Sequence, residues 1–193
     1  MGRWEPNARG RLAQAAMTLY AEQGFEQTTA AEIARRAGLT ERTFFRHFAD
    51  KREVLFYGTE PMRDLMLRAV ADAPPGAPAL DTVGLILRAA GTILQEDPAL
   101  TRARHQIVSA NAELRERELV KLDQIAAGIA AVLRERGVAE PTASLAAETG
   151  IAVYKVAFAR WISEPGHPDL PHIIQESMAD LRGLLTGHLP SPA

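Results

Sequence analysis

The chain has 193 residues, of which 47% are hydrophobic, so it is long enough for one large or two small domains and too apolar for a disordered chain of this length. It contains no cysteine, which excludes disulfides and thiolate metal sites. No run of 18 apolar residues and no basic start followed by an apolar run occurs, so we expect a soluble, cytoplasmic protein with no membrane partner.

The net charge of −2 is unevenly distributed along the chain. Residues 1–52 carry nine Lys/Arg and six Asp/Glu, a net charge of +3, whereas residues 53–193 carry 13 bases and 18 acids, a net charge of −5. A basic N-terminal segment followed by an acidic remainder is typical of a nucleic-acid-binding module joined to a second domain. A chance imbalance between two solvated surfaces is the alternative.

The first predicted helix ends at Gly24. Because glycine readily adopts the left-handed conformation, Gly24 is expected to take it and to turn Phe25 back onto Tyr20. The helix is recognised by apolar residues that recur at spacings of three and four, which are Leu12, Ala15, Ala16, Leu19 and Tyr20.

Three further helix starts follow. Thr29 and Glu32 have the spacing of a capping box and open a short helix that stops at Gly38. Thr40 caps the next helix, which ends near Phe48, and Asp50 caps a fourth that extends to about residue 73. Since proline removes a backbone donor, a kink in this fourth helix is expected at Pro61.

The rest of the chain also reads as helix. The segment APPGAP, residues 73–78, is predicted to be a loop. Capping residues, prolines and glycines then delimit helices at about 79–96, 98–110, 112–136, 142–163 and 168–187. No run alternates with a period of two for long, so the predicted fold class is all-α.

Residues 29–48 form the pattern of a helix-turn-helix motif, whose second helix enters the major groove of DNA. Phe44 and Phe48 are one turn apart and are predicted to be buried, whereas Arg42 and Arg46 lie one turn apart on a different face. The alternative is that the aromatic residues are ordinary core and the arginines an ordinary solvated face.

The longer segment TTAAEIARRAGLTERTFFRHFADKREVL resembles the DNA-binding region of the TetR (tetracycline-repressor) family of bacterial regulators. The similar features are Gly24-Phe25 at the end of the first helix, the paired threonines, the aromatic helix that ends in His47-Phe48, and Lys51. They extend over residues 9–56. The resemblance implies two domains, a DNA-binding domain at residues 1–52 and a helical ligand-binding and dimerisation domain at residues 53–193.

The resemblance also implies roles for individual residues. Thr29, His47 and Lys51 are expected to contact phosphate, and Thr40, Arg42 and Thr43 to approach bases and backbone. Phe45 departs from the pattern, because the family often has tyrosine there, and phenylalanine cannot donate a hydrogen bond; it is expected to pack on a thymine methyl group or a sugar edge. Arg46 stands where another aromatic residue is common, and its guanidinium suits guanine or two phosphate oxygens.

In this family the body binds a small ligand and dimerises through its last two long helices. Two apolar stripes support that reading, although both could instead face the core of the monomer. The first consists of Leu145, Ala146, Gly150, Val153, Ala157 and Trp161, and the second of Ile173, Ile174, Met178, Leu181, Leu184 and Leu185. Polar or aromatic residues inside apolar stretches are the candidate pocket residues, namely His105, Ser109, Asn111, Tyr154 and Trp161.

These features predict a transcriptional regulator that acts without a cofactor. We expect a repressor that binds a palindromic, double-stranded DNA operator as a homodimer and is released by a small, mostly apolar ligand. An enzyme is not expected, because paired-histidine metal motifs, phosphate loops and nucleophile elbows are missing from the sequence. The alternative is a helical interaction or ligand-binding protein without operator binding.

Overall fold

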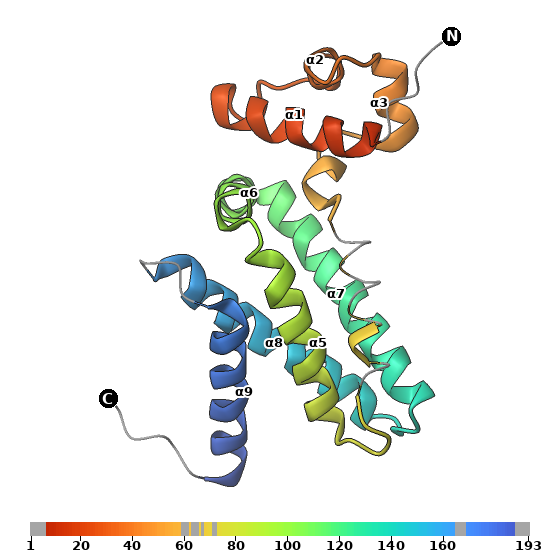
Figure 1. Ribbon diagram of the computed structural model, residues 1–193, viewed down its shortest axis with the longest axis vertical. Coiled ribbons are helices and arrows are strands. Elements are labelled where there is room, and N and C mark those ends of the chain that lie inside the picture. Colours follow the sequence, from red (N-terminus) through yellow and green to blue (C-terminus); the bar gives the residue numbers. More distant parts are fainter. Residues whose placement is uncertain are drawn as a thin grey trace. The chain divides into compact units, whose positions relative to one another are not determined.

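The computed structural model describes residues 7–58, 62, 66, 68–70, 73–164 and 169–187 (Figure 1). Within these ranges the regular structure is helical and no strand occurs, which confirms the predicted all-α class. The elements are α1 (Ala8–Gln23), α2 (Ala30–Arg36), α3 (Glu41–His47), the 3₁₀ helix η1 (Glu53–Phe56), α5 (Ala79–Leu94), α6 (Pro98–Ala110), α7 (Ala112–Glu135), α8 (Thr142–Ser163) and α9 (Leu170–Thr186). The predicted bounds of α5 to α9 agree with these to within two residues.

The chain divides into two compact units. The first comprises residues 1–60 and 99–116, and the second comprises residues 61–98 and 117–193. The first unit therefore contains residues 53–60 and 99–116 in addition to residues 1–52. The functional division at residue 52 stays a prediction.

The first unit has a core built from α1, α2, α3 and η1. Leu12, Ile33 and Phe44 are completely buried in it, as their positions on the predicted apolar faces require. Val108 of α6 and Leu114 of α7 are also completely buried in the same cluster. Burial of large apolar side chains is the dominant favourable term in folding, so these later residues stabilise the helix-turn-helix motif.

Two glycines shape the first unit at positive φ. Gly38, at φ 67°, ends α2 and opens the turn to α3, where the Leu39 amide donates to the Ala34 carbonyl over 2.8 Å. Gly24 has φ 87° and ψ 157°, so the prediction of a left-handed helical conformation there is wrong. Its extended ψ still brings Phe25 against Tyr20, with the ring centroids 5.2 Å apart.

The segment directly after Asp50 differs from the predicted long helix, whereas the described residues farther along it, 62, 66 and 68–70, are helical as predicted. The Asp50 carboxylate accepts the amides of Arg52 (2.8 Å) and Glu53 (3.0 Å), as a cap should. The element that follows is a single 3₁₀ turn, η1, and a turn at residues 57–58 follows it. Val54, Leu55 and Phe56 are all buried in the core of the first unit. Pro61 and the predicted kink lie outside the described residues.

The second unit is built on α5, α8 and α9, which pack against one another. Close approach needs glycine at two crossings: a Cβ on Gly150 would lie 2.4 Å from Val83 Cγ1, and one on Gly91 would lie 2.8 Å from Ile174 Cδ1. The core contains Leu133 of α7 and Trp161 of α8, each 1% exposed.

The two apolar stripes of α8 and α9 lie mostly in this core. Ala146, Gly150, Val153, Ala157 and Trp161 are buried, as are Ile173, Ile174 and Met178. Most of both stripes therefore pack within the chain, which was the alternative to a dimer interface. The reason is that α8 and α9 must cover α5 and each other. Leu145, Leu184 and Leu185 are the exceptions, with exposed fractions of 63–69%.

Candidate nucleic-acid interface

Helix α3 is capped by threonine side chains at its N-terminus. The Thr40 hydroxyl accepts the Thr43 amide over 3.2 Å, and the two hydroxyl oxygens lie 2.9 Å apart. Such a cap satisfies an amide that has no partner inside the helix. It also places two hydroxyl groups at the end of the helix that the sequence predicts to contact DNA.

The faces of α3 separate as predicted. Phe44 and Phe48 are buried with their ring centroids 5.7 Å apart, whereas Arg42 and Arg46 are exposed. Phe45 is 54% exposed, although the edge-to-face contact of its ring with Phe44 fixes its direction. The helix is therefore anchored by one aromatic face and presents cations and a third aromatic ring to solvent.

The other predicted polar contacts on α3 are less accessible. Thr43 and His47 are half-buried. The Nε2 atom of His47 is buried and makes no hydrogen bond within the described part of the chain. A phosphate contact through Nε2 would therefore require the ring to turn.

The N-terminus of α2 has the predicted capping box. The Thr29 hydroxyl accepts the Glu32 amide (3.2 Å), and Glu32 Oε2 accepts the Thr29 amide (2.9 Å) and the Thr29 hydroxyl (2.9 Å). Hydrogen bonds from the Thr29 backbone and side chain lower the pKa of Glu32. The exposed Thr29 side chain can thus offer its hydroxyl to phosphate only by giving up the Glu32 carboxylate.

The side chain of Lys51 lies against the loop between α1 and α2. Its ammonium donates to the carbonyls of Phe25 (2.8 Å), Glu26 (3.0 Å) and Thr28 (3.0 Å), and it sits 4.5 Å from the centroid of the Phe25 ring. An ammonium has three hydrogens, so these carbonyls use all its donors. The loop that ends at the Thr29 cap is therefore held by Lys51.

Two more long-range contacts hold the same region, and the sequence gives no signal for either. The buried Tyr20 hydroxyl donates to the Lys51 carbonyl over 2.6 Å, and burial, followed by the nearby Asp50 carboxylate, raises the pKa of Tyr20. Arg11 donates from Nη2 to the Ala37 carbonyl at the turn between α2 and α3. Helix α1 thus holds the end of α2 through Arg11 and the segment that follows α3 through Tyr20.

The five candidate pocket residues do not form one cluster within a single unit. On α6, the Ser109 hydroxyl lies 3.2 Å from His105 Nε2, and directly after α6 the Asn111 side-chain amide donates to the Ile107 carbonyl (2.7 Å). These residues belong to the first unit. Tyr154 and Trp161 belong to the second unit. Both contact Phe158, with ring centroids 5.5 and 5.8 Å apart, in an aromatic row along α8. Their role in ligand binding stays a prediction.

Comparison with known protein families identifies both parts of the chain. Residues 12–57 match the family described as bacterial regulatory proteins, tetR family, and residues 77–186 match the MftR C-terminal domain. The chain belongs to the TetR family. It is therefore a DNA-binding transcriptional regulator, and the predicted helix-turn-helix motif is confirmed.

Individual relatives in the TetR family are distant. The transcriptional regulator TcmR of Streptomyces glaucescens is 29% identical over 134 residues, which cover 66% of this chain and 59% of that protein. The nucleoid occlusion factor SlmA of Vibrio campbellii is 26% identical over 72% of this chain and 73% of its own. Among solved structures, Thermus thermophilus FadR, a repressor in complex with lauroyl-CoA, has a TM-score of 0.60 and 25% identity over 96% of this chain and 97% of its own.

Two further observations concern membrane-spanning helices and metal sites. No described helix is both long enough and apolar enough to cross a membrane. The described residues also contain no group of three or more histidine, aspartate or glutamate side chains arranged to hold a metal ion.

Proposed function

We propose that the protein is a repressor that binds a palindromic operator as a homodimer and releases it when an apolar ligand binds the second unit. The observation that carries this proposal is the geometry of α3: buried Phe44 and Phe48 anchor the helix, and Arg42, Phe45 and Arg46 face solvent in a helix-turn-helix motif. Such a helix fits the major groove, where base edges can be read.

In this proposal, the exposed residues of α3 contact different parts of the DNA. Thr40, Thr43 and Arg42 lie at or near the N-terminal end of the helix and contact bases and backbone there. Arg46 reads a guanine, because a guanidinium can donate to guanine O6 and N7 together. The Phe45 ring packs against a thymine methyl group or a sugar edge. His47 and Thr29 contact phosphate after the small rearrangements described above.

Replacing Arg46 with alanine tests the assignment of base reading. If Arg46 reads a guanine, its loss costs about 1–3 kcal/mol of operator binding and relaxes the preference at one base pair. Fluorescence anisotropy with the operator and with single-base variants measures both effects. Arg134→Ala, which removes the same charge from an exposed ion pair with Glu140 in the second unit, is the control and should leave the affinity unchanged. Equal losses for Arg46→Ala on all sequences would assign Arg46 to the DNA backbone.

The homodimer is proposed to form through the outer face of α8 and the end of α9. Leu145, Ala152 and Val156 are exposed on one face of α8, and Leu184 and Leu185 are exposed on α9. Leu145 and Val156 are 64% and 65% exposed and lie on the same face of α8, and contiguous exposed apolar patches mark interaction sites. A second copy would bury them. Sedimentation equilibrium should give twice the chain mass, and a monomer at micromolar concentration would contradict this proposal.

The ligand is proposed to be a molecule with a long apolar acyl chain. The support is the similarity to Thermus thermophilus FadR, whose structure contains lauroyl-CoA, together with the apolar core of the second unit and the aromatic row of α8.

A gel-shift assay with the DNA upstream of the protein's own gene tests this proposal. The protein should retard that fragment, and a saturating concentration of lauroyl-CoA should release it, whereas free coenzyme A should not. Retardation without release would reject the acyl ligand and retain the regulator. Failure to retard any fragment would favour a helical protein without operator binding.

A further inference from the structure

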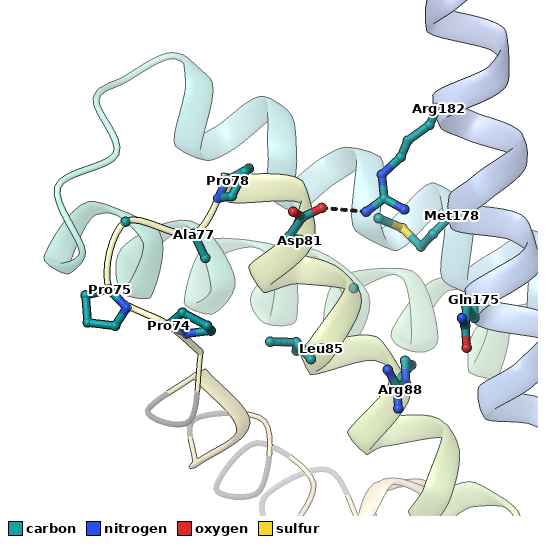
Figure 2. Close-up of a pocket in the computed structure, with 12 residues that line it drawn as sticks. Pro74, Pro75, Ala77, Pro78, Asp81, Leu85, Arg88, Gln175, Met178 and Arg182 are labelled. Carbon is teal, nitrogen blue, oxygen red and sulfur yellow. Dashed lines mark hydrogen bonds and ion pairs between the residues drawn. The ribbon is translucent and has the colours of Figure 1, made fainter.

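A groove crosses the surface of α5 in the second unit. Its lining residues belong neither to the candidate nucleic-acid interface nor to the proposed dimer interface. It has a volume of about 530 Å³ and lies between the loop at residues 74–78 and α9 (Figure 2). A volume in this range suits a small molecule. Figure 2 shows Leu85 on the side of α5 that faces the loop, and Gln175 and Met178 on the side of α9 that faces α5.

The loop wall of the groove is held in place by Arg136. The guanidinium of Arg136 donates to the carbonyls of Val70 (3.0 Å), Ala73 (3.0 Å) and Pro74 (2.7 Å). Pro74, Pro75 and Pro78 restrict the backbone further, because each proline ring fixes φ. A wall that is rigid before binding loses little conformational entropy when a ligand arrives.

The floor of the groove contains Gly84, a glycine that the packing of α5 does not require. A Cβ at this position would lie 3.6 Å from Met178 Cε, an ordinary contact, whereas Gly91 and Gly150 are needed for helix crossings. Glycine is the poorest helix former after proline, so its presence in the middle of α5 weakens the helix. Its effect here is to keep the floor open between Leu85 and Met178.

The charges of the groove favour an anion. Arg182 is paired with Asp81 at 2.5 Å, so the two together contribute no net charge. Arg88 is exposed, and its guanidinium makes no ion pair or hydrogen bond within the described ranges of the chain. The net charge of the lining is therefore +1. Gln175, on the facing helix, adds an amide that can donate a hydrogen bond.

We propose that this groove binds a small aromatic monocarboxylate. The carboxylate pairs with Arg88, which suits its planar, two-oxygen geometry, and receives a second hydrogen bond from Gln175. The ring lies over Gly84 between the proline wall and Met178. A single net positive charge matches a monoanion better than a doubly charged phosphate. This site is separate from the proposed DNA contacts and does not depend on the acyl ligand.

Isothermal titration of the full chain with 2-naphthoate tests the proposal, with 2-naphthamide as the uncharged probe of the same shape. We expect 2-naphthoate to bind with a dissociation constant of about 1 mM or lower. Arg88→Gln should weaken it at least about tenfold, the equivalent of one charge-assisted hydrogen bond. Arg88→Lys should retain more of the affinity than Arg88→Gln.

Gly84→Leu tests the shape of the groove independently of charge, because its side chain would occupy the floor. The matched control is Gly128→Leu, since Gly128 is a helical glycine of α7 whose Cβ would meet nothing within 4 Å. We expect Gly84→Leu to abolish binding and Gly128→Leu to retain it, with circular dichroism confirming that both fold. Absence of 2-naphthoate binding, equal binding of the amide, or wild-type affinity in both Arg88→Gln and Gly84→Leu would overturn the proposal.

Discussion

Raising the salt concentration from 50 to 200 mM is expected to weaken operator binding about a thousandfold. Each phosphate that a lysine or arginine neutralises releases a counterion, and about six such contacts in a dimer produce a loss of that size. The first unit supplies the cations, because residues 1–52 carry a net charge of +3 and Arg42 is exposed on α3. The net charge of −2 for the whole chain gives no hint of this dependence.

The measurement is a plot of the logarithm of the binding constant against the logarithm of the salt concentration. Titration in potassium glutamate and in potassium chloride controls for the identity of the anion. The Arg46→Ala variant should give nearly the same slope if that side chain reads a base, because its loss then removes no phosphate contact. A loss of affinity below tenfold over this range would show that few phosphates are contacted and would contradict the proposed mode of binding.

Replacing Lys51 with methionine is expected to lower both the stability of the first unit and its affinity for DNA. Hydrogen bonds to a charged group contribute roughly 1.5–3 kcal/mol each. Water replaces part of that loss at a half-buried loop, so we expect about 2–3 kcal/mol less free energy of unfolding. The loop that carries the Thr29 cap would then be free to move, and operator affinity should fall by about tenfold or more even at temperatures where the variant is folded.

Thermal denaturation and the salt slope of binding together separate two roles for Lys51. A residue that holds the loop lowers the melting temperature and leaves the salt slope unchanged. A phosphate contact, as the family resemblance implies, leaves the melting temperature unchanged and makes the slope shallower by about one unit. Arg35→Met, at an exposed cation on α2, is the matched control for loss of charge alone. An unchanged melting temperature for Lys51→Met would reject the role in positioning.

Local sequence signals predicted most of the fold. Capping residues and apolar spacing located the helices because they act within one or two turns: Thr29 and Thr40 cap α2 and α3, and Phe44 and Phe48 are buried. The same local reasoning failed directly after Asp50, where the chain forms the turn η1 before the helical residues 62, 66 and 68–70.

Contacts between distant parts of the chain could not be predicted in this way. The insertion of Val108 and Leu114 into the core of the first unit is an example, because an apolar stripe does not indicate which partner will cover it. The stripes of α8 and α9 were ambiguous for the same reason, and most of their residues pack within the chain. For Lys51, the residue type allowed a phosphate or a carbonyl partner, and only the folded loop places three carbonyls around the ammonium.

The central claim is that a dimer of this chain reads a specific, twofold-symmetric DNA site with α3. Sequencing the genomic fragments that the purified protein retains tests this claim most directly. The proposal predicts an enriched near-palindrome whose half-sites lie about one helical turn, roughly 34–36 Å, or a multiple of it apart. It also predicts that Arg46→Ala relaxes one position in each half-site. Retained fragments with no common motif, or with a single asymmetric site bound by one chain, would contradict it.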